Sequence, residues 1–174
     1  MDPMNRGLFL GRFQPLHKGH LAAIREAARK VDELYVGIGS ANESGTERNP
    51  FPVSDRRKMI EAATPDLANI KIIEVPDIPG HDDEWVKYLE DRYPKFDVIF
   101  TGNPFTEELF GQKGYPVTTV TMVPDVSGTK IRELIGTKGD WQSLVPEVVV
   151  EIVAHSTPSQ KARLSGSSTG QKEV

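Results

Sequence analysis

The chain alternates short apolar segments with segments of helical periodicity, and it does so five times in succession. Leu21, Ile24, Ala28 and Val31, for example, recur at the spacing that places side chains on one face of a helix. The expected strands cover residues 7–10, 34–39, 71–75, 97–100 and 117–122. The expected helices cover residues 17–31, 54–63, 82–92, a short segment after 104, 130–135, 141–144 and 146–154. Repeated strand–helix units give parallel strands with helices on both faces, so we expect a doubly wound, mostly parallel five-stranded α/β sheet (a Rossmann-like fold) with C-terminal helices.

The length of the chain, 174 residues, is suited to one domain with a substantial core. We expect this domain to cover residues 1–155, because the composition changes after the last expected helix. Residues 156–174 are rich in Ser, Gly, Thr and Gln and hold few apolar side chains. Such a composition cannot bury enough apolar surface to fold, so a disordered tail is predicted.

The composition excludes several classes of function. The chain has no cysteine, which rules out disulfides, thiolate catalysis and cysteine-ligated metal sites. Its formal net charge of −4 argues against broad nucleic-acid binding. No apolar run is long enough to span a bilayer, and the N-terminus lacks the apolar core of a secretory signal. We therefore expect a cytoplasmic protein with neither nucleic-acid nor membrane partners.

Two turns between an expected strand and an expected helix carry the residues most suited to chemistry. The first covers residues 11–20, GRFQPLHKGH, and holds two glycines, two histidines and two cations. The second holds Ser127, Gly128 and Thr129 at the start of a late helix. Helix N-termini favour anions through their unpaired N–H groups, and ligands of open α/β sheets bind beyond the carboxyl ends of the strands. Both turns therefore predict a phosphate site.

The usual nucleotide and hydrolase signatures are missing from the sequence. No Gly-x-x-x-x-Gly-Lys-Ser/Thr pattern occurs, and the Gly-Ile-Gly at residues 37–39 lacks the third glycine of a dinucleotide-binding turn. Neither His-Glu-x-x-His nor Gly-x-Ser-x-Gly is present. A P-loop enzyme, a zinc protease and an α/β-hydrolase are accordingly not indicated.

The two turns resemble the paired signatures of the nucleotidyltransferase superfamily. Residues 17–20, His-Lys-Gly-His, are similar to its His-x-Gly-His motif, and residues 127–132, Ser-Gly-Thr-Lys-Ile-Arg, are similar to its Ser/Thr-x-Thr-x-x-Arg motif. Both occur in the family's order and on strand-to-helix turns. The resemblance implies a doubly wound α/β fold and the transfer of a nucleotidyl group from a nucleoside triphosphate, with release of pyrophosphate.

Within that superfamily the chain is most similar to the archaeal-type nicotinamide-nucleotide adenylyltransferases. The likeness covers roughly residues 6–154 and rests on phrases at residues 11–15, 39–41, 48–51, 84–86, 101–104 and 139–141. It implies the reaction of ATP with nicotinamide mononucleotide (NMN) to give NAD and pyrophosphate. The NMN phosphate is itself an anion and can attack the α-phosphorus in line, so that positioning and charge stabilisation suffice for catalysis.

The resemblance also implies the residues of the site. The catalytic groups would be His17, His20, Arg12 and Arg132. ATP and its phosphates would contact Gly11, Phe13, Gly19, Arg48, Ser127, Thr129, Gly102 and Asn103. NMN would contact Trp85, as a stacking surface for nicotinamide, together with Ser40 and Asp77. No protein metal ligands are expected, because Mg²⁺ (or another divalent cation) would be held mainly by the ATP phosphates.

Several alternatives stay open on the residues alone. Trp85 can be a core residue that packs with Leu89, and Arg48 can be a solvated loop cation. The basic run at residues 56–58 is typical of a solvated helix face, although one of these cations can contact phosphate. The acceptor can instead be phosphopantetheine, flavin mononucleotide or a phosphoalcohol with CTP, and a non-catalytic nucleotide sensor would use the same pocket. The family commonly forms symmetric assemblies, so a homo-oligomer is expected.

Overall fold

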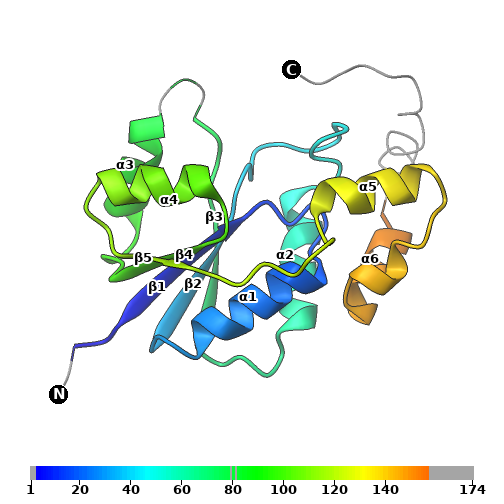
Figure 1. Cartoon of the computed structure of the whole chain (residues 1–174). Coiled ribbons are helices and arrows are strands. Elements are labelled where there is room, and N and C mark those ends of the chain that lie inside the picture. Colours follow the sequence, from blue (N-terminus) through cyan, green and yellow to red (C-terminus); the bar gives the residue numbers. More distant parts are fainter. Residues whose placement is uncertain (1–2, 79, 81, 157–174) are drawn as a thin grey trace.

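The computed structural model describes residues 3–78, 80 and 82–156 (Figure 1). Strands and helices alternate from the first strand to the fifth helix, as the apolar periodicity predicts. The strands are β1 (Arg6–Gly11), β2 (Glu33–Ile38), β3 (Ile70–Glu74), β4 (Val98–Thr101) and β5 (Val117–Thr119). The helices are α1 (Lys18–Ala28), α2 (Val53–Ala63), α3 (Asp82–Arg92), α4 (Pro104–Gln112), α5 (Gly128–Gly136), the 3₁₀ turn η1 (Gln142–Leu144) and α6 (Glu147–Ala154).

The five strands form one sheet in the order β3-β2-β1-β4-β5, and every pair of neighbours is parallel. The fold class predicted from the sequence is confirmed. Successive strands step outward from β1 to β2 and β3, after which the chain returns to place β4 on the other side of β1. This reversal of direction makes the carboxyl ends of β1 and β4 the switch point of the sheet, where ligands of such folds bind.

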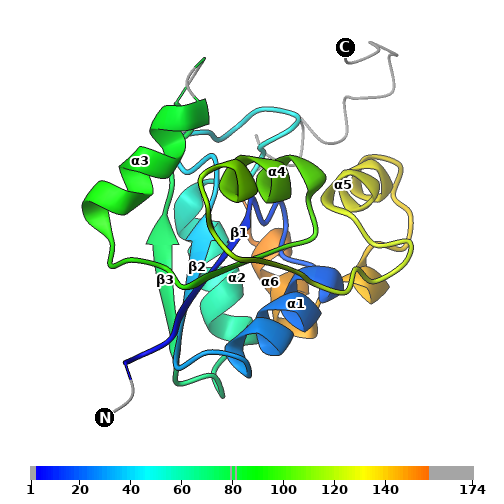
Figure 2. The same cartoon turned by 60° about the vertical axis from the view of Figure 1, so that its left-hand side comes forward.

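Helices cover both faces of the sheet (Figures 1 and 2). Successive side chains of a strand point to opposite faces, and β1 contributes to a core cluster on each. Phe9 belongs to a core cluster that includes residues of α1, α2, α5 and α6. Leu8 is fully buried in a second cluster on the other face, formed with α3 and α4. Helix α6 packs directly against α2, so that the C-terminal helices extend the layer formed by α1 and α2.

Some element boundaries differ from the sequence-based expectation. Helix α1 ends at Ala28 rather than 31, although Val31 remains buried against the same core cluster. Strand β5 ends at Thr119 rather than 122, because after the bond from Val120 N–H to the carbonyl of Thr101 no further pairing with β4 follows. The shortened strand leaves residues 120–127 as an irregular connection. Part of this connection lines the pocket described below.

The described part of the chain ends at Ser156, which is buried and donates its hydroxyl hydrogen to the carbonyl of Val153 at 2.6 Å. The tail predicted for residues 156–174 lies, apart from Ser156, outside the described residues. The single-domain boundary at 155 stays a prediction. Within the described residues, none of the helices has the length and apolar character that crossing a membrane requires.

Candidate active site

A pocket of about 410 Å³ lies at the carboxyl ends of β1 and β4. Most residues named from the sequence line it: Gly11, Arg12, His17, Gly19, His20, Ser40, Arg48, Asp77, Trp85, Gly102, Asn103 and Ser127. Its size is that of a small-molecule site. The topology explains the gathering, because the loops after parallel strands meet at one edge of the sheet.

Three helices begin at this pocket. His17 is the N-cap of α1, Asn103 is the N-cap of α4, and Ser127 is the N-cap of α5. The Asn103 side chain accepts from Phe105 N–H at 2.9 Å, and the Ser127 hydroxyl accepts from Lys130 N–H at 3.1 Å. Each helix N-terminus carries a partial positive charge, so the pocket favours a multiply charged anion.

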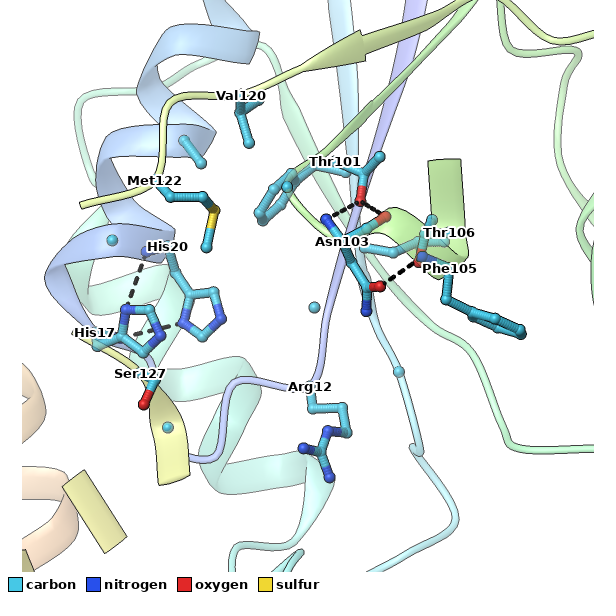
Figure 3. Close-up of a pocket in the computed structure, with 18 of the residues that line it drawn as sticks. Arg12, His17, His20, Thr101, Asn103, Phe105, Thr106, Val120, Met122 and Ser127 are labelled. Carbon is cyan, nitrogen blue, oxygen red and sulfur yellow. Dashed lines mark hydrogen bonds between the residues drawn. The ribbon is translucent and has the colours of Figure 1, made fainter. Parts of the chain in front are cut away.

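His17 and His20 form a reciprocal pair at the start of α1. The N–H of His20 donates to Nδ1 of His17 at 3.2 Å, and the N–H of His17 donates to Nδ1 of His20 at 3.3 Å. The two rings stack with centroids 3.6 Å apart, and Figure 3 shows them side by side on one wall of the pocket, with Asn103 across from them. Because both Nδ1 atoms act as acceptors, each neutral ring carries its proton on Nε2.

Burial disfavours the charged form of both rings. It lowers the pKa of His17 from 6.5 to about 4. It also lowers the pKa of His20 well below 6.5, and the neighbouring His17 and Arg12 lower it further. Both side chains are therefore neutral near pH 7 in this structure. Each neutral ring can donate its Nε2–H to a phosphate oxygen.

Gly19 has a specific reason to lack a side chain. A Cβ at this position would lie 2.9 Å from Cε1 and 3.0 Å from Nδ1 of His17. The space that a side chain at this position would occupy is taken by the His17 ring.

Phe13, Thr129 and Arg132 do not line the pocket. Phe13 is fully buried, with its ring centroid 4.7 Å from that of His20. Arg132 donates from Nη1 to the carbonyl of Gln14 at 2.9 Å and from Nη2 to Oγ1 of Thr129 at 3.3 Å. In this structure Arg132 therefore ties α5 to the first turn, and its contact with phosphate stays a prediction.

The loop after β2 reaches the pocket through Arg48, whose side chain is exposed. Asn49 beside it accepts from Nη1 of Arg12 at 3.4 Å. The loop is anchored by Gln14, which the sequence analysis did not single out. The buried Gln14 amide donates to the carbonyl of Phe51 at 3.0 Å and accepts from the N–H of Phe51 at 2.9 Å. An uncharged side chain within a motif gives little sequence signal for such a contact.

The interpretation of the basic run at residues 56–58 as a solvated helix face is wrong for Arg56. Its side chain is fully buried, on the face of α2 that also carries Met59, Ile60 and Ala63. Spacings of three, four and seven residues place these side chains on one stripe, so helical periodicity could have found Arg56. Arg57, by contrast, is partly exposed and pairs with Glu74 at 3.3 Å.

The residues expected to bind NMN lie on the β2–β3 side of the pocket and on α3. The Ser40 hydroxyl donates to Oδ1 of Asp77 at 3.0 Å. Trp85 lines the pocket and also packs against the core cluster that contains Leu89, with its ring 6.2 Å from Phe110. Trp85 therefore packs against the core and also borders the pocket. Its Nε1 is buried and has no hydrogen-bond partner within the described structure.

The donors around the pocket are imidazole, guanidinium, hydroxyl and backbone N–H groups. In residues 3–78, 80 and 82–156, no three His, Asp or Glu side chains are grouped to hold a metal ion. This arrangement is suited to an anionic ligand.

Comparison with known proteins identifies the family. The cytidylyltransferase-like family model matches residues 8–134. The nicotinamide-nucleotide adenylyltransferase of Pyrococcus furiosus is 39% identical over 168 residues, which cover 92% of this chain and 89% of the relative. That of Pyrococcus abyssi is 41% identical over 155 residues, covering 86% and 83%. The chain belongs to the nicotinamide-nucleotide adenylyltransferase family.

Solved structures share the fold of this adenylyltransferase family member at lower identity. A bifunctional NMN adenylyltransferase/ADP ribose pyrophosphatase from Francisella tularensis, complexed with AMP and a Mn ion, superposes with a TM-score of 0.76 at 19% identity, covering 94% of this chain. A NadR protein in complex with NAD and AMP-PNP superposes with a TM-score of 0.61 at 21% identity, covering 86% of this chain. The chain spans about half the length of each, 52% and 47%.

The histidine pair yields a prediction for this nicotinamide-nucleotide adenylyltransferase family member. Imidazole NMR signals of the ligand-free protein should show both rings uncharged at pH 7, with His17 protonating near pH 4. The unfolded chain binds these protons near pH 6.5, so folding stability contributed by the neutral pair is complete above pH 6.5 and declines as the pH falls toward 4. Midpoints near 6.5 for both rings in the folded protein would contradict the buried, stacked arrangement.

Proposed function

We propose that the chain transfers the adenylyl group of ATP to NMN, forming NAD and releasing pyrophosphate. The observation that carries this proposal is the meeting of three helix N-termini and two neutral imidazoles in one pocket that Trp85 also lines. The helix N-termini and the imidazoles suit a triphosphate, and the indole of Trp85 suits a flat cationic ring. The names of the curated relatives support the same reaction.

The bond changes need no protein nucleophile. An oxygen of the NMN phosphate forms a bond to the α-phosphorus of ATP, and the bond from that phosphorus to the oxygen bridging to the β-phosphate breaks. Pyrophosphate leaves with the electron pair. Two anions must be brought together, so the work of the protein is to align them and to stabilise charge on the transferring group.

The histidine pair is assigned to the transferring phosphate. His20 and His17 donate Nε2–H to oxygens of the α- and β-phosphates, from rings whose pKa burial lowers in the ligand-free protein. Arg12, in the lining of the same pocket, supplies a planar fork with a full positive charge. Gly11, Gly102 and Asn103 bring backbone and amide groups of β1, β4 and α4 to the nucleotide.

The remaining assignments follow the placement of the other predicted residues. Ser127 and the first turn of α5, with Thr129 and Arg132, bind the β- and γ-phosphates, and Arg48 closes over them from its exposed loop. Trp85 stacks on nicotinamide, and Ser40 with Asp77 binds the polar part of NMN. Phe13 supports the His20 ring from behind.

A divalent cation, Mg²⁺ or another, would be held by the triphosphate. The pocket donors suit anions, so the phosphates themselves are the fitting ligands for the metal. The ion supplies neutralisation of the charge that develops on pyrophosphate. The protein is also proposed to be a cytoplasmic homo-oligomer, an expectation from the family and the composition.

The decisive experiment measures pyrophosphate release from ATP and Mg²⁺ with one acceptor at a time. NMN should support release, with NAD appearing in equal amount. Release only with phosphopantetheine or flavin mononucleotide would retain the adenylyl-transfer chemistry and overturn the acceptor. ATP binding without release on any acceptor would indicate a nucleotide sensor instead.

The His20→Ala variant tests charge stabilisation in the transition state. Loss of one donor aimed at the reacting phosphate should lower kcat by about 100- to 1,000-fold while the Kd for ATP rises far less. Steady-state kinetics and calorimetry measure the two quantities. Lys30→Ala, which removes only the exposed pair with Glu26, is the control. Equal losses in kcat and in ATP affinity would refute a role confined to the transition state.

The Trp85→Ala variant tests the NMN subsite. Removing the indole should raise the Kd for NMN by about tenfold or more, since a desolvated cation–π contact is worth about 2 kcal/mol. The Kd for ATP should stay unchanged, and Trp85→Phe should recover part of the NMN affinity. Circular dichroism checks the packing with Phe110. Parallel losses for both substrates would instead assign Trp85 to the core alone.

A further inference from the structure

Arg56 is a buried cation that the proposed reaction does not use. It lies in α2 with its whole side chain excluded from solvent, beside Met59 and Ile60 on the core-facing stripe of the helix. Charged side chains are rarely buried completely, because the loss of hydration is costly unless other groups replace water. The groups that replace water at Arg56 indicate its purpose.

Four backbone carbonyls surround the guanidinium, and they belong to two loops at the pocket. Nη1 donates to the carbonyls of Arg12 at 3.0 Å and Gly39 at 2.7 Å. Nη2 donates to the carbonyls of Ser40 at 3.0 Å and Glu43 at 3.2 Å. One planar group thus joins the turn after β1 to the loop after β2. Arg12, Gly39 and Ser40 all line the pocket.

The charge of Arg56 is balanced by carbonyl dipoles rather than by an ion pair. Within the described residues it forms no salt bridge, and its Nε has no hydrogen-bond partner. Burial and the nearby Arg12 guanidinium lower the pKa of Arg56 to about 10, against the opposing influence of Asp77 and Glu74. The group remains a cation at pH 7. A well-packed apolar side chain would cost less at such a position, so stability alone does not explain the arginine.

The carbonyls that Arg56 holds flank two strained residues. Phe13 has φ of 54° and Ser40 has φ of 48°, in the left-handed region that non-glycine residues rarely adopt. The carbonyl of Arg12 precedes Phe13, and the carbonyls of Gly39 and Ser40 lie on either side of the Ser40 Cα. Such conformations persist when the surroundings fix them. Here the guanidinium fixes the peptide groups at both places.

Because the peptide group is planar, each carbonyl that Arg56 holds also fixes the direction of the N–H group that follows it. In a trans peptide the N–H points opposite to the C=O. With the carbonyls of Arg12 and Gly39 directed at Arg56, the N–H groups of Phe13 and Ser40 point away from it. Arg56 also sets where the Arg12 side chain leaves the backbone.

We propose that Arg56 is a positioning residue, which locks the Arg12 turn and the Ser40 loop into the single arrangement that binds substrate phosphate. It acts through Arg12 and Ser40 and touches no substrate. A guanidinium is required because its rigid fork can serve four carbonyls at once, whereas an ammonium group presents three donors from one point. The expected loss of turnover rests on the proposed function, whereas the expected loss of ATP affinity does not.

The test compares Arg56→Lys and Arg56→Gln with the matched control Arg57→Lys, one residue along the same helix and paired with Glu74. For folded Arg56→Lys, the Kd for ATP should rise by about 10- to 100-fold, and kcat should fall with it, since small misplacements of binding groups have such effects. Arg57→Lys should match the wild type. A lowered Tm with unchanged ATP affinity in Arg56→Lys would overturn the proposal and leave a structural role only.

A double-mutant cycle keeps the proposal testable even where Arg56→Gln fails to fold. Arg12→Ala and Arg56→Lys should each weaken ATP binding, and the double variant should lose less than the sum of the two single losses, because Arg56 acts in part through Arg12. Additive losses would overturn this coupling. Calorimetry measures the Kd for ATP without turnover. A wild-type protein that is inactive with NMN would refute the proposed function, and the ATP affinities of the variants would still test the role of Arg56.

Discussion

The parallel pairing of β1 with both β2 and β4 is the constraint on which the site depends. Because all strands run in one direction, their carboxyl ends reach one edge, and the reversal beside β1 leaves a crevice there. Helices α1 and α4 must begin at that edge, since each follows one of these strands directly. The chain brings α5 to the same place by ending β5 at Thr119 and crossing the crevice in an irregular segment. The topology alone therefore brings three helix N-termini to this pocket, whichever charged side chains line it.

The pocket is lined by the cations Arg12 and Arg48 and also by groups that attract anions without carrying a net charge. The chain as a whole has a formal net charge of −4, and the three helix N-termini add partial charges that need no counter-ion. The His17–His20 pair stays neutral in this structure because burial lowers the pKa of both rings, and each Nδ1 accepts a hydrogen bond from a backbone N–H. A pocket built from fixed dipoles is organised before substrate arrives, so little reorganisation accompanies the reaction.

Much of this arrangement could be predicted from the sequence, for reasons that differ between residues. Strand and helix order followed from periodicity, and His17, Gly19 and Ser127 followed from motifs whose function requires a local backbone geometry. Trp85 could not be divided between core and pocket by sequence, because one indole serves both. The charge of Arg56 indicates a solvated side chain, whereas its spacing from Met59 and Ile60 indicates the buried face of α2, and the spacing gives the correct answer. Gln14 was missed because its partner, Phe51, lies 37 residues away and the contact is to backbone.

Three side chains make long-range contacts that the sequence does not reveal, and these contacts share a physical role. Each side chain donates a hydrogen bond to a backbone carbonyl of a distant loop. Gln14 reaches across 37 residues of sequence, Arg56 across 44 and Arg132 across 118. A loop rich in glycine and polar residues has few apolar contacts to fix its shape, so it depends on buried polar groups for definition. Such groups are strongly specifying, since an unpaired buried carbonyl or guanidinium is costly in any alternative arrangement. Motif residues such as His17, His20 and Ser127 line the pocket, and the buried polar side chains behind them fix the backbone that carries them.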